Sequence, residues 1–165
     1  GIEASLTGHL VFSTLHTNDA ASTPVRLIDM GAPRFMVATA LQAVVAQRLV
    51  RQVCWHCGQP HTPTPHEMNW LASMGAAADT SGYTEGAGCQ QCNHTGYRGR
   101  MAVYEMLEMN FEMVEAANHH DPAHFMKMAR QQMAGKTLRS QAVGEVLRGR
   151  TTVAEAMRIS NQFED

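Results

Sequence analysis

Four cysteines in two pairs are the residues of this chain whose types and spacing point most directly to chemistry. Cys54 and Cys57 form one C-x-x-C pair, Cys89 and Cys92 form another, and the sequence holds no other cysteine. Two such pairs can bring four thiolates to one tetrahedral ion, and Zn²⁺ held by four sulfurs has no open position for a substrate. We therefore predict a structural zinc site. An iron site of the rubredoxin type would use the same ligands, and the spacing leaves it open.

Other uses of these cysteines fit the surrounding sequence less well. No signal-peptide pattern precedes them, which favours a reducing compartment and a metal over two disulfides. His56, His61 and His94 lie close enough in sequence to replace one thiolate, but four thiolates need no substitute. A catalytic zinc site of the deaminase kind would need an H-x-E segment and a proline directly before a cysteine pair, and the sequence has neither.

A second candidate group is His16, which follows the apolar run HLVFSTL at residues 9–15. Such a run predicts a strand covered on both faces, and ligands of α/β sheets gather beyond the carboxyl ends of strands. We expect a helix to begin near Asn18 or Asp19, so His16 would lie beside free amides that favour a phosphate. The alternative is a histidine that only caps the turn. His9 would lie about 23 Å away along an extended strand, and we expect it to be structural.

The elements that must position these groups are predicted to form an α/β layer followed by helices. We expect helices over residues 20–30 and, because apolar positions recur every three to four residues, from Pro33 through Leu49. A short strand at 50–53 would then lead into the first cysteine pair. Between the pairs, residues 66–74 have room for a short helix.

Beyond the second pair, we predict a strand at 101–106 and then only helices. Asp121-Pro122 is a helix start, with an N-cap followed by proline at the first helical position. Another helix is expected from Leu138, and Thr152 with Glu155 forms a capping box for the last one.

Composition limits the partners that the chain could bind. The formal net charge is −2, with 44% hydrophobic and 17% charged residues, so the chain is globular and has no general basic face. We therefore expect no nucleic-acid partner. No apolar run approaches the roughly 18 residues of a membrane-spanning helix. The sequence begins without methionine on what resembles the end of a helix, so we expect it to be part of a longer protein.

Several segments resemble the secretion ATPases that power type II secretion and type IV pilus assembly. Residues 7–20, TGHLVFSTLHTNDA, resemble the histidine box of that family. The segment 45–51, the first cysteine pair, residues 88–100 (GCQQCNHTGYRGR) and Tyr104-Glu105 follow it too, while residues 62–84 match weakly. Within the family, the chain is most similar to the extension ATPases of the GspE, PilB and MshE type, because retraction motors generally lack the cysteine subdomain. The resemblance favours the ATPases of mannose-sensitive haemagglutinin (MSHA) pili, the MshE kind.

The resemblance implies a hexameric ATPase with a RecA-like core, cytoplasmic and peripheral to the inner membrane, that couples ATP hydrolysis to pilin or pseudopilin assembly. It implies ATP and Mg²⁺ as cofactors. His16 would be the catalytic box histidine near the γ-phosphate, with Thr14 beside it, and His9 would be the second histidine of the box. The partners of the ATPase would be further copies of the chain, in a homo-hexamer, and the inner-membrane platform protein. The cysteine subdomain would dock on this platform protein.

On this interpretation the chain has an α/β fold in three parts. Residues 1–52 would be the C-terminal part of a RecA-like P-loop ATPase core, residues 53–96 an inserted four-cysteine zinc subdomain, and residues 97–165 a returning strand with a helical tail. No G-x-x-x-x-G-K-[ST] loop is present, so we expect the chain to be inactive by itself. The alternative function is a free-standing zinc-ribbon adaptor that binds protein or nucleic acid.

Overall fold

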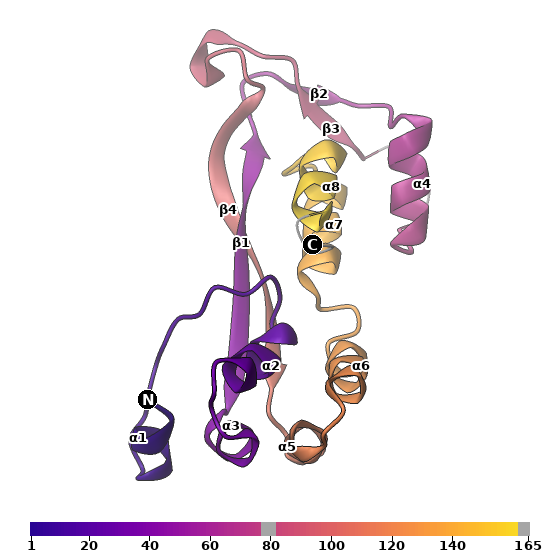
Figure 1. Ribbon diagram of the computed structural model, residues 1–165. Coiled ribbons are helices and arrows are strands. Elements are labelled where there is room, and N and C mark those ends of the chain that lie inside the picture. The colour runs from indigo at the N-terminus through magenta and orange to yellow at the C-terminus, as the bar shows by residue number, and fades with distance from the viewer. Residues whose placement is uncertain (77–81, 162–165) are drawn as a thin grey trace. The chain divides into compact units, whose positions relative to one another are not determined.

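A computed structural model describes residues 1–76 and 82–161. Residues 77–81 and 162–165, which belong to the second and third predicted parts, lie outside the described residues. The described chain is mixed α/β (Figure 1). Its strands are β1 (Ala43–Val53), β2 (Gly58–Pro60), β3 (Thr84–Gly86) and β4 (Tyr97–Glu108). Its helices are α1 (Ile2–Leu6), α2 (Ser22–Asp29), α3 (Arg34–Ala40), α4 (Pro65–Ser73), α5 (Phe111–Asn118), α6 (Pro122–Gln132), α7 (Leu138–Leu147) and α8 (Val153–Asn161), with a 3₁₀ turn, η1, at Gln90–Cys92.

The described strands pair in twos, β1 with β4 and β2 with β3. The chain divides into two compact units. The first comprises residues 1–46 and 105–137, and the second comprises residues 47–104 and 138–165. Both β1 and β4 therefore pass from one unit into the other.

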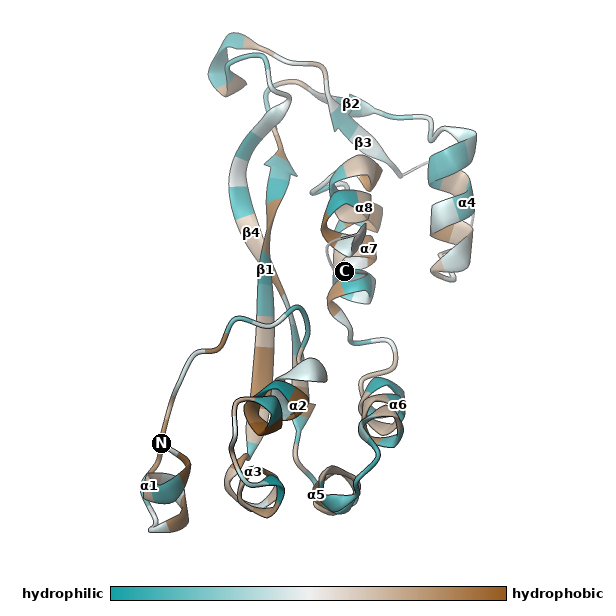
Figure 2. Cartoon of the chain, in the orientation of Figure 1, coloured by the Kyte–Doolittle hydropathy of each residue, from teal (hydrophilic) through white to brown (hydrophobic). Residues whose placement is uncertain are grey.

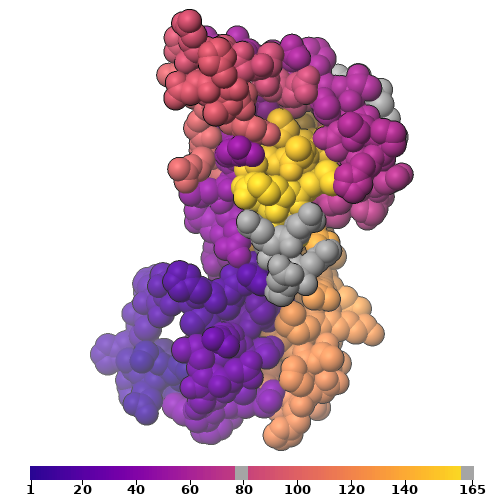
Figure 3. Space-filling view, turned by 45° about the horizontal axis from the view of Figure 1, so that its top comes forward, coloured from indigo at the N-terminus to yellow at the C-terminus, as the bar shows by residue number. Residues whose placement is uncertain are grey.

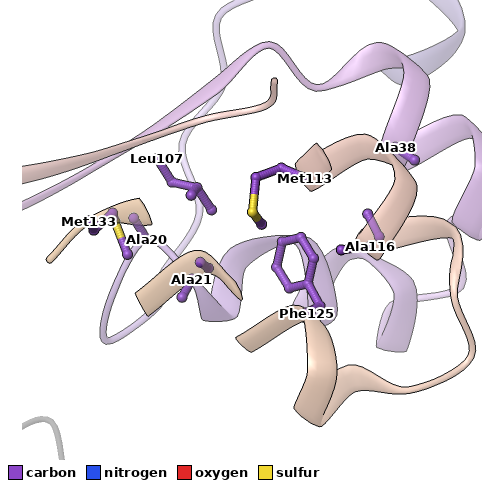
Figure 4. Packing of buried hydrophobic residues seen from close by; sticks show 10 residues of the cluster. Ala20, Ala21, Ala38, Leu107, Met113, Ala116, Phe125 and Met133 are labelled. Carbon is purple, nitrogen blue, oxygen red and sulfur yellow. The ribbon is translucent and has the colours of Figure 1, made fainter. Parts of the chain in front are cut away.

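The first unit is held together by a core of small and flexible apolar side chains. Figure 4 shows Phe125 of α6 facing Met113 and Ala116 of α5. The alanines allow the helices to approach closely, while the methionines fill irregular gaps. The buried cluster comprises Ala20, Ala21, Ala38, Leu107, Met113, Ala116, Ala117, Phe125, Ala129 and Met133.

Local capping signals place the helices of this core. The Asn110 side chain accepts a hydrogen bond from the Met113 N–H at 2.9 Å, and Asp121 accepts one from the Ala123 N–H at 2.9 Å. Each bond satisfies a backbone donor that a helix start would leave free. The predicted helix start at Asp121-Pro122 is confirmed. Helix α5 lies within the region predicted to be helical, without a predicted start of its own.

The second unit contains the β2–β3 hairpin together with α4, α7 and α8. β2 pairs antiparallel with β3, with Gly58 opposite Gly86 and Pro60 opposite Thr84. α8 contacts both α7 and α4, and Figure 3 shows α8 in yellow beside the magenta segment that contains α4. The predicted helices at 66–74, from Leu138 and from Thr152 are confirmed as α4, α7 and α8.

The strand predicted at residues 9–15 is wrong. This segment is an irregular loop between α1 and α2, part of it brown in Figure 2, in which Leu10 and Phe12 are 82% and 88% exposed. A strand exists only where a neighbouring strand accepts and donates its ladder hydrogen bonds. No strand of the described residues pairs with this segment. An apolar run alone therefore did not decide its conformation.

The long helix predicted from Pro33 through Leu49 is also wrong. α3 ends at Ala40, Leu41 has extended backbone angles, and β1 begins at Ala43. Apolar residues spaced by four fit a strand as well as a helix, because four is a multiple of the two-residue period. Val45 and Leu49 lie on the same face of β1, and they are 61% and 49% exposed rather than buried. The short strand predicted at 50–53 is the end of this longer strand.

Candidate functional site

The four cysteine side chains of the second unit converge. Their Sγ atoms all lie within 4.8 Å of one another. The Sγ atoms of Cys54 and Cys89 are 4.0 Å apart, those of Cys57 and Cys92 are 3.8 Å apart, and those of Cys89 and Cys92 are 3.7 Å apart. All four are free thiols, and a disulfide would need a separation of about 2.05 Å.

These separations fit a metal ion. Four sulfurs at about 2.3 Å from a tetrahedral ion lie about 3.8 Å from one another. Three of the separations match this value, so the cysteine cluster could hold a metal ion. It is the one group of metal-binding side chains found among residues 1–76 and 82–161, and no histidine belongs to it.

The backbone around the cluster preorganises both pairs. The Cys54 N–H donates to the Gly96 carbonyl at 2.9 Å, which joins the first pair to the segment after the second. Gly96 has a φ of +76° and passes Gly86 so closely that a Cβ on Gly86 would lie 2.0 Å from the Gly96 oxygen. Glycine is required at this crossing, because any side chain would push the two segments apart.

The thiols of the cluster differ in acidity. Burial raises the pKa of Cys57 to about 12. The backbone N–H of Cys89 donates to Cys92 Sγ at 3.2 Å, and this bond lowers the pKa of Cys92 to about 6. Four adjacent thiolates repel one another unless a cation neutralises them, and metal binding to such a site releases protons.

The histidines near the cluster have other neighbours. His61 Nε2 lies 3.1 Å from a Glu67 carboxylate oxygen, and His61 Nδ1 lies 3.1 Å from one of Glu85. His56 stacks on Trp55 with ring centroids 3.6 Å apart. Both rings are therefore engaged outside the cysteine cluster.

The predicted nucleotide-facing residues lie in the first unit, on the loop between α1 and α2. Thr14 and His16 are both exposed. His9 is exposed too, but its Nδ1 lies 3.2 Å from the Ala4 carbonyl oxygen and 3.3 Å from Thr7 Oγ1. His9 is thus held against the end of α1, while His16 is presented to solvent.

Polar contacts hold the chain directly after His16. Thr17 Oγ1 lies 2.9 Å from Thr23 Oγ1, and the Ser22 N–H donates to Asp19 Oδ1 at 2.8 Å. The Ala20 N–H donates to Glu105 Oε1 at 2.7 Å, across a sequence separation of 85 residues. In the sequence, Glu105 is distinguished only as part of the Tyr104-Glu105 motif. The sequence signal for such a contact is a carboxylate at a position of β4 that should face the core, because buried and exposed residues alternate along this strand.

A second buried carboxylate organises the other unit. The Glu155 side chain is fully buried and accepts hydrogen bonds from Arg51 and Arg158. Of the predicted capping box, one bond is present, from the Glu155 N–H to Thr152 Oγ1 at 3.0 Å, while the Glu155 carboxylate bonds the arginines instead of the Thr152 N–H. Burial opposes ionisation of Glu155, but the hydrogen bonds from Arg158 and Arg51 outweigh it and lower its pKa to about 2.

The fold of this chain also occurs in a solved ATPase structure. The solved structure of the ATPase DotB of Legionella pneumophila shares this fold, with a TM-score of 0.59 and 18% identity over 97% of this chain and 34% of that one. The sequence profile of the Type II/IV secretion system protein family matches residues 1–158. The chain belongs to that family, and the family resemblance of its motifs is confirmed.

Two curated relatives show where in the family the similarity lies. The chain is 42% identical to the type II secretion system protein E of Dickeya dadantii over 98% of its own length and 31% of the relative. It is 40% identical to the type IV pilus assembly ATPase PilB of Thermus thermophilus over 94% of its own length and 17% of that relative. The chain thus spans less than a third of the length of either.

The relatives do not single out the MshE kind. No helix within the described residues is long and apolar enough to cross a membrane.

Proposed function

We propose that this chain is part of a motor ATPase that couples ATP hydrolysis to pilin or pseudopilin assembly, in type IV pilus biogenesis or type II secretion. The observation that carries the proposal is the family match over residues 1–158, which includes the histidine segment, the cysteine centre and the terminal helices. Relatives named for each of the two processes match almost the whole chain. A match of this extent favours the motor over a free-standing zinc-ribbon adaptor.

In this proposal, His16 is the catalytic histidine near the γ-phosphate of ATP, and Thr14 lies beside it. The exposure of both side chains supports the proposal, because each can meet a nucleotide. His9 is the second box histidine, and its contacts with the end of α1 support a part in holding the loop. The sequence has no phosphate-binding loop of the G-x-x-x-x-G-K-[ST] type, so the groups that bind ATP and Mg²⁺ would come from outside residues 1–165.

The cysteine centre is proposed to hold Zn²⁺ in a structural role. When bound, the ion would supply a cross-link between the end of β1 and the segment at η1. Cys54, Cys57, Cys89 and Cys92 would supply four thiolate ligands to it, which leaves no position for a substrate. An iron ion would fit the same four sulfurs, and elemental analysis of the purified chain distinguishes the two metals.

The assembly state and partners follow from the family and stay predictions. They comprise a RecA-like core, a homo-hexamer, docking of the cysteine subdomain on the inner-membrane platform protein, and a cytoplasmic location peripheral to that membrane. The MshE kind and the three-part division at residues 52 and 96 also remain predictions.

The test is ATP turnover by the complete ATPase that carries this chain, compared with the chain alone. We expect His16→Ala to lower kcat at least tenfold in the complete enzyme while the fold is retained, and the chain alone to show no turnover. Unchanged turnover in the His16→Ala enzyme would remove His16 from the chemistry. Salt-dependent nucleic-acid binding by the chain would instead support the adaptor.

A further inference from the structure

Glu105 occupies a place on β4 where a buried apolar residue is expected. Along this strand, Val103, Glu105 and Leu107 are 2%, 4% and 0% exposed, whereas the intervening Tyr104 and Met106 are 59% and 48% exposed. The inward face of the strand therefore reads apolar, acidic, apolar. A carboxylate is costly to bury unless hydrogen bonds satisfy it.

The bond that Glu105 makes is directed at the loop after His16. The Ala20 N–H donates to Glu105 Oε1 at 2.7 Å, a short bond of the charge-assisted kind. Ala20 and Ala21 are themselves 0% and 1% exposed and pack in the same cluster as Leu107. β4 therefore anchors this turn both through its core side chain and through a carboxylate.

The anchored turn adjoins His16. Ala20 is four residues after His16, and between them Thr17 is already tied to Thr23 and Asp19 to the Ser22 N–H. On the other side of His16, the contacts of His9 with the end of α1 are followed by residues 10–14, which are all exposed. The position of His16 is thus set from its carboxyl-terminal side.

We infer that Glu105 is a positioning residue for His16, acting through the Ala20 amide to hold the loop from which the imidazole projects. The inference rests on the proposed function only where it concerns ATP turnover. The restraint of the loop by Glu105 is independent of any activity. Glu105 is placed here as a group that acts through the backbone, without contact to nucleotide.

The restraint of the loop by Glu105 and its effect on ATP turnover are tested by separate measurements. The first is hydrogen exchange of the Ala20 amide in this chain, for wild type, Glu105→Ala, Glu105→Gln and the control Glu108→Ala. Glu108 lies on the same strand, and its side chain is exposed. We expect at least tenfold faster exchange in Glu105→Ala, a smaller change in Glu105→Gln, which keeps an acceptor oxygen, and none in Glu108→Ala. Thermal melts identify a variant that has lost its fold. If Glu105→Ala does not fold, the exchange rate of Glu105→Gln is compared with those of wild type and Glu108→Ala.

The second measurement is steady-state turnover of the complete ATPase with the same variants and with His16→Ala. We expect Glu105→Ala to lower kcat at least tenfold with KM for ATP unchanged, and Glu105→Gln to restore most of it. The double variant Glu105→Ala/His16→Ala should be no slower than His16→Ala alone, because both changes remove one function.

The outcomes separate the inference from the proposed function. If His16→Ala lowers turnover but Glu105→Ala adds a further, independent loss, the positioning role is overturned and the motor function stands. If exchange of the Ala20 amide is unchanged in Glu105→Ala, the loop restraint itself is overturned. If His16→Ala leaves turnover unchanged, the assignment of His16 chemistry is wrong, whatever the exchange measurement shows.

Discussion

Glu155 accepts hydrogen bonds from both the backbone and the side chain of Arg51. The Arg51 N–H donates to Oε1 at 3.0 Å, and the guanidinium donates to Oε2 at 2.9 and 2.7 Å. The same guanidinium lies 4.0 Å above the Tyr97 ring. Arg51 stands three residues before Cys54, and Glu155 lies in the first turn of α8. This pair therefore ties the terminal helix to β1, the strand that leads directly to Cys54.

We predict that Glu155→Ala destabilises the second unit by about 2–4 kcal/mol, because it removes charge-assisted hydrogen bonds from a buried site. Arg51 and Arg158 are about half exposed, so water can partly solvate them after the loss. Urea unfolding followed by tryptophan fluorescence reports on this unit, since Trp55 and Trp70 both lie in it. Arg100→Ala, at an exposed position of β4, is the control and should change stability by less than about 0.5 kcal/mol.

The same carboxylate makes the second unit sensitive to acid. The pKa of Glu155 is about 2 in the folded chain, against an ordinary value of 4.5, so the unfolded chain takes up the proton first. The stabilisation is therefore complete above about pH 4.5 and is lost as the pH falls from there towards about 2. We expect the urea midpoint to fall across this window in wild type and to fall much less in Glu155→Gln. Parallel curves for the two proteins would contradict the assignment.

Metal content tests the cysteine centre. We expect about one zinc ion per chain when the protein is purified without added metal, and loss of that zinc in Cys54→Ser or Cys89→Ser. Inductively coupled plasma mass spectrometry measures both and detects iron in the same sample. Four reactive thiols without bound metal would show that the cluster is not a metal centre.

Removal of the metal should affect the two units unequally. Chelation is expected to increase hydrogen exchange in the second unit around residues 53–60 and 86–97, because metal binding to such a site contributes to folding. The helices α5 and α6, in the first unit, should exchange at an unchanged rate. Faster exchange throughout the chain would mean that the metal stabilises more than its own subdomain.

Two phenylalanines give a matched test of the first unit. Phe125 is 3% exposed in the alanine-rich core and Phe111 is 81% exposed at the start of α5. We predict that Phe125→Ala costs about 3–5 kcal/mol, because it leaves a cavity that the small neighbours cannot fill. Phe111→Ala should cost less than about 0.5 kcal/mol. Urea unfolding followed by the helical circular dichroism signal measures both.

Short-range features of the sequence predicted the starts of two helices and the two cysteine pairs. Asp121-Pro122 and Thr152 act through backbone groups within three residues, so their helix starts could be read directly. Within each C-x-x-C pair, the two cysteines are three residues apart, so the chain itself brings their side chains close together. Neither inference needed knowledge of what lies elsewhere in the chain.

The two wrong predictions, a strand at residues 9–15 and a helix through Leu49, concern segments whose conformation depends on residues far away in sequence. Residues 9–15 have strand composition but meet no partner strand among the described residues, and Leu49 fits a helical spacing although β1 pairs with β4. Strand pairing is decided by the neighbour, and the apolar pattern of one segment does not contain that information.

The sequence by itself determined the two cysteine pairs, the helix caps and the family, because each rests on residue types at short spacings. Only the tertiary structure decided the roles of Glu105 and Glu155. Glu105 meets the Ala20 amide across 85 positions, and Glu155 meets Arg51 across 104. Each carboxylate lies in the core because folding brings it a distant donor, and that donor cannot be read from the glutamate's own neighbours.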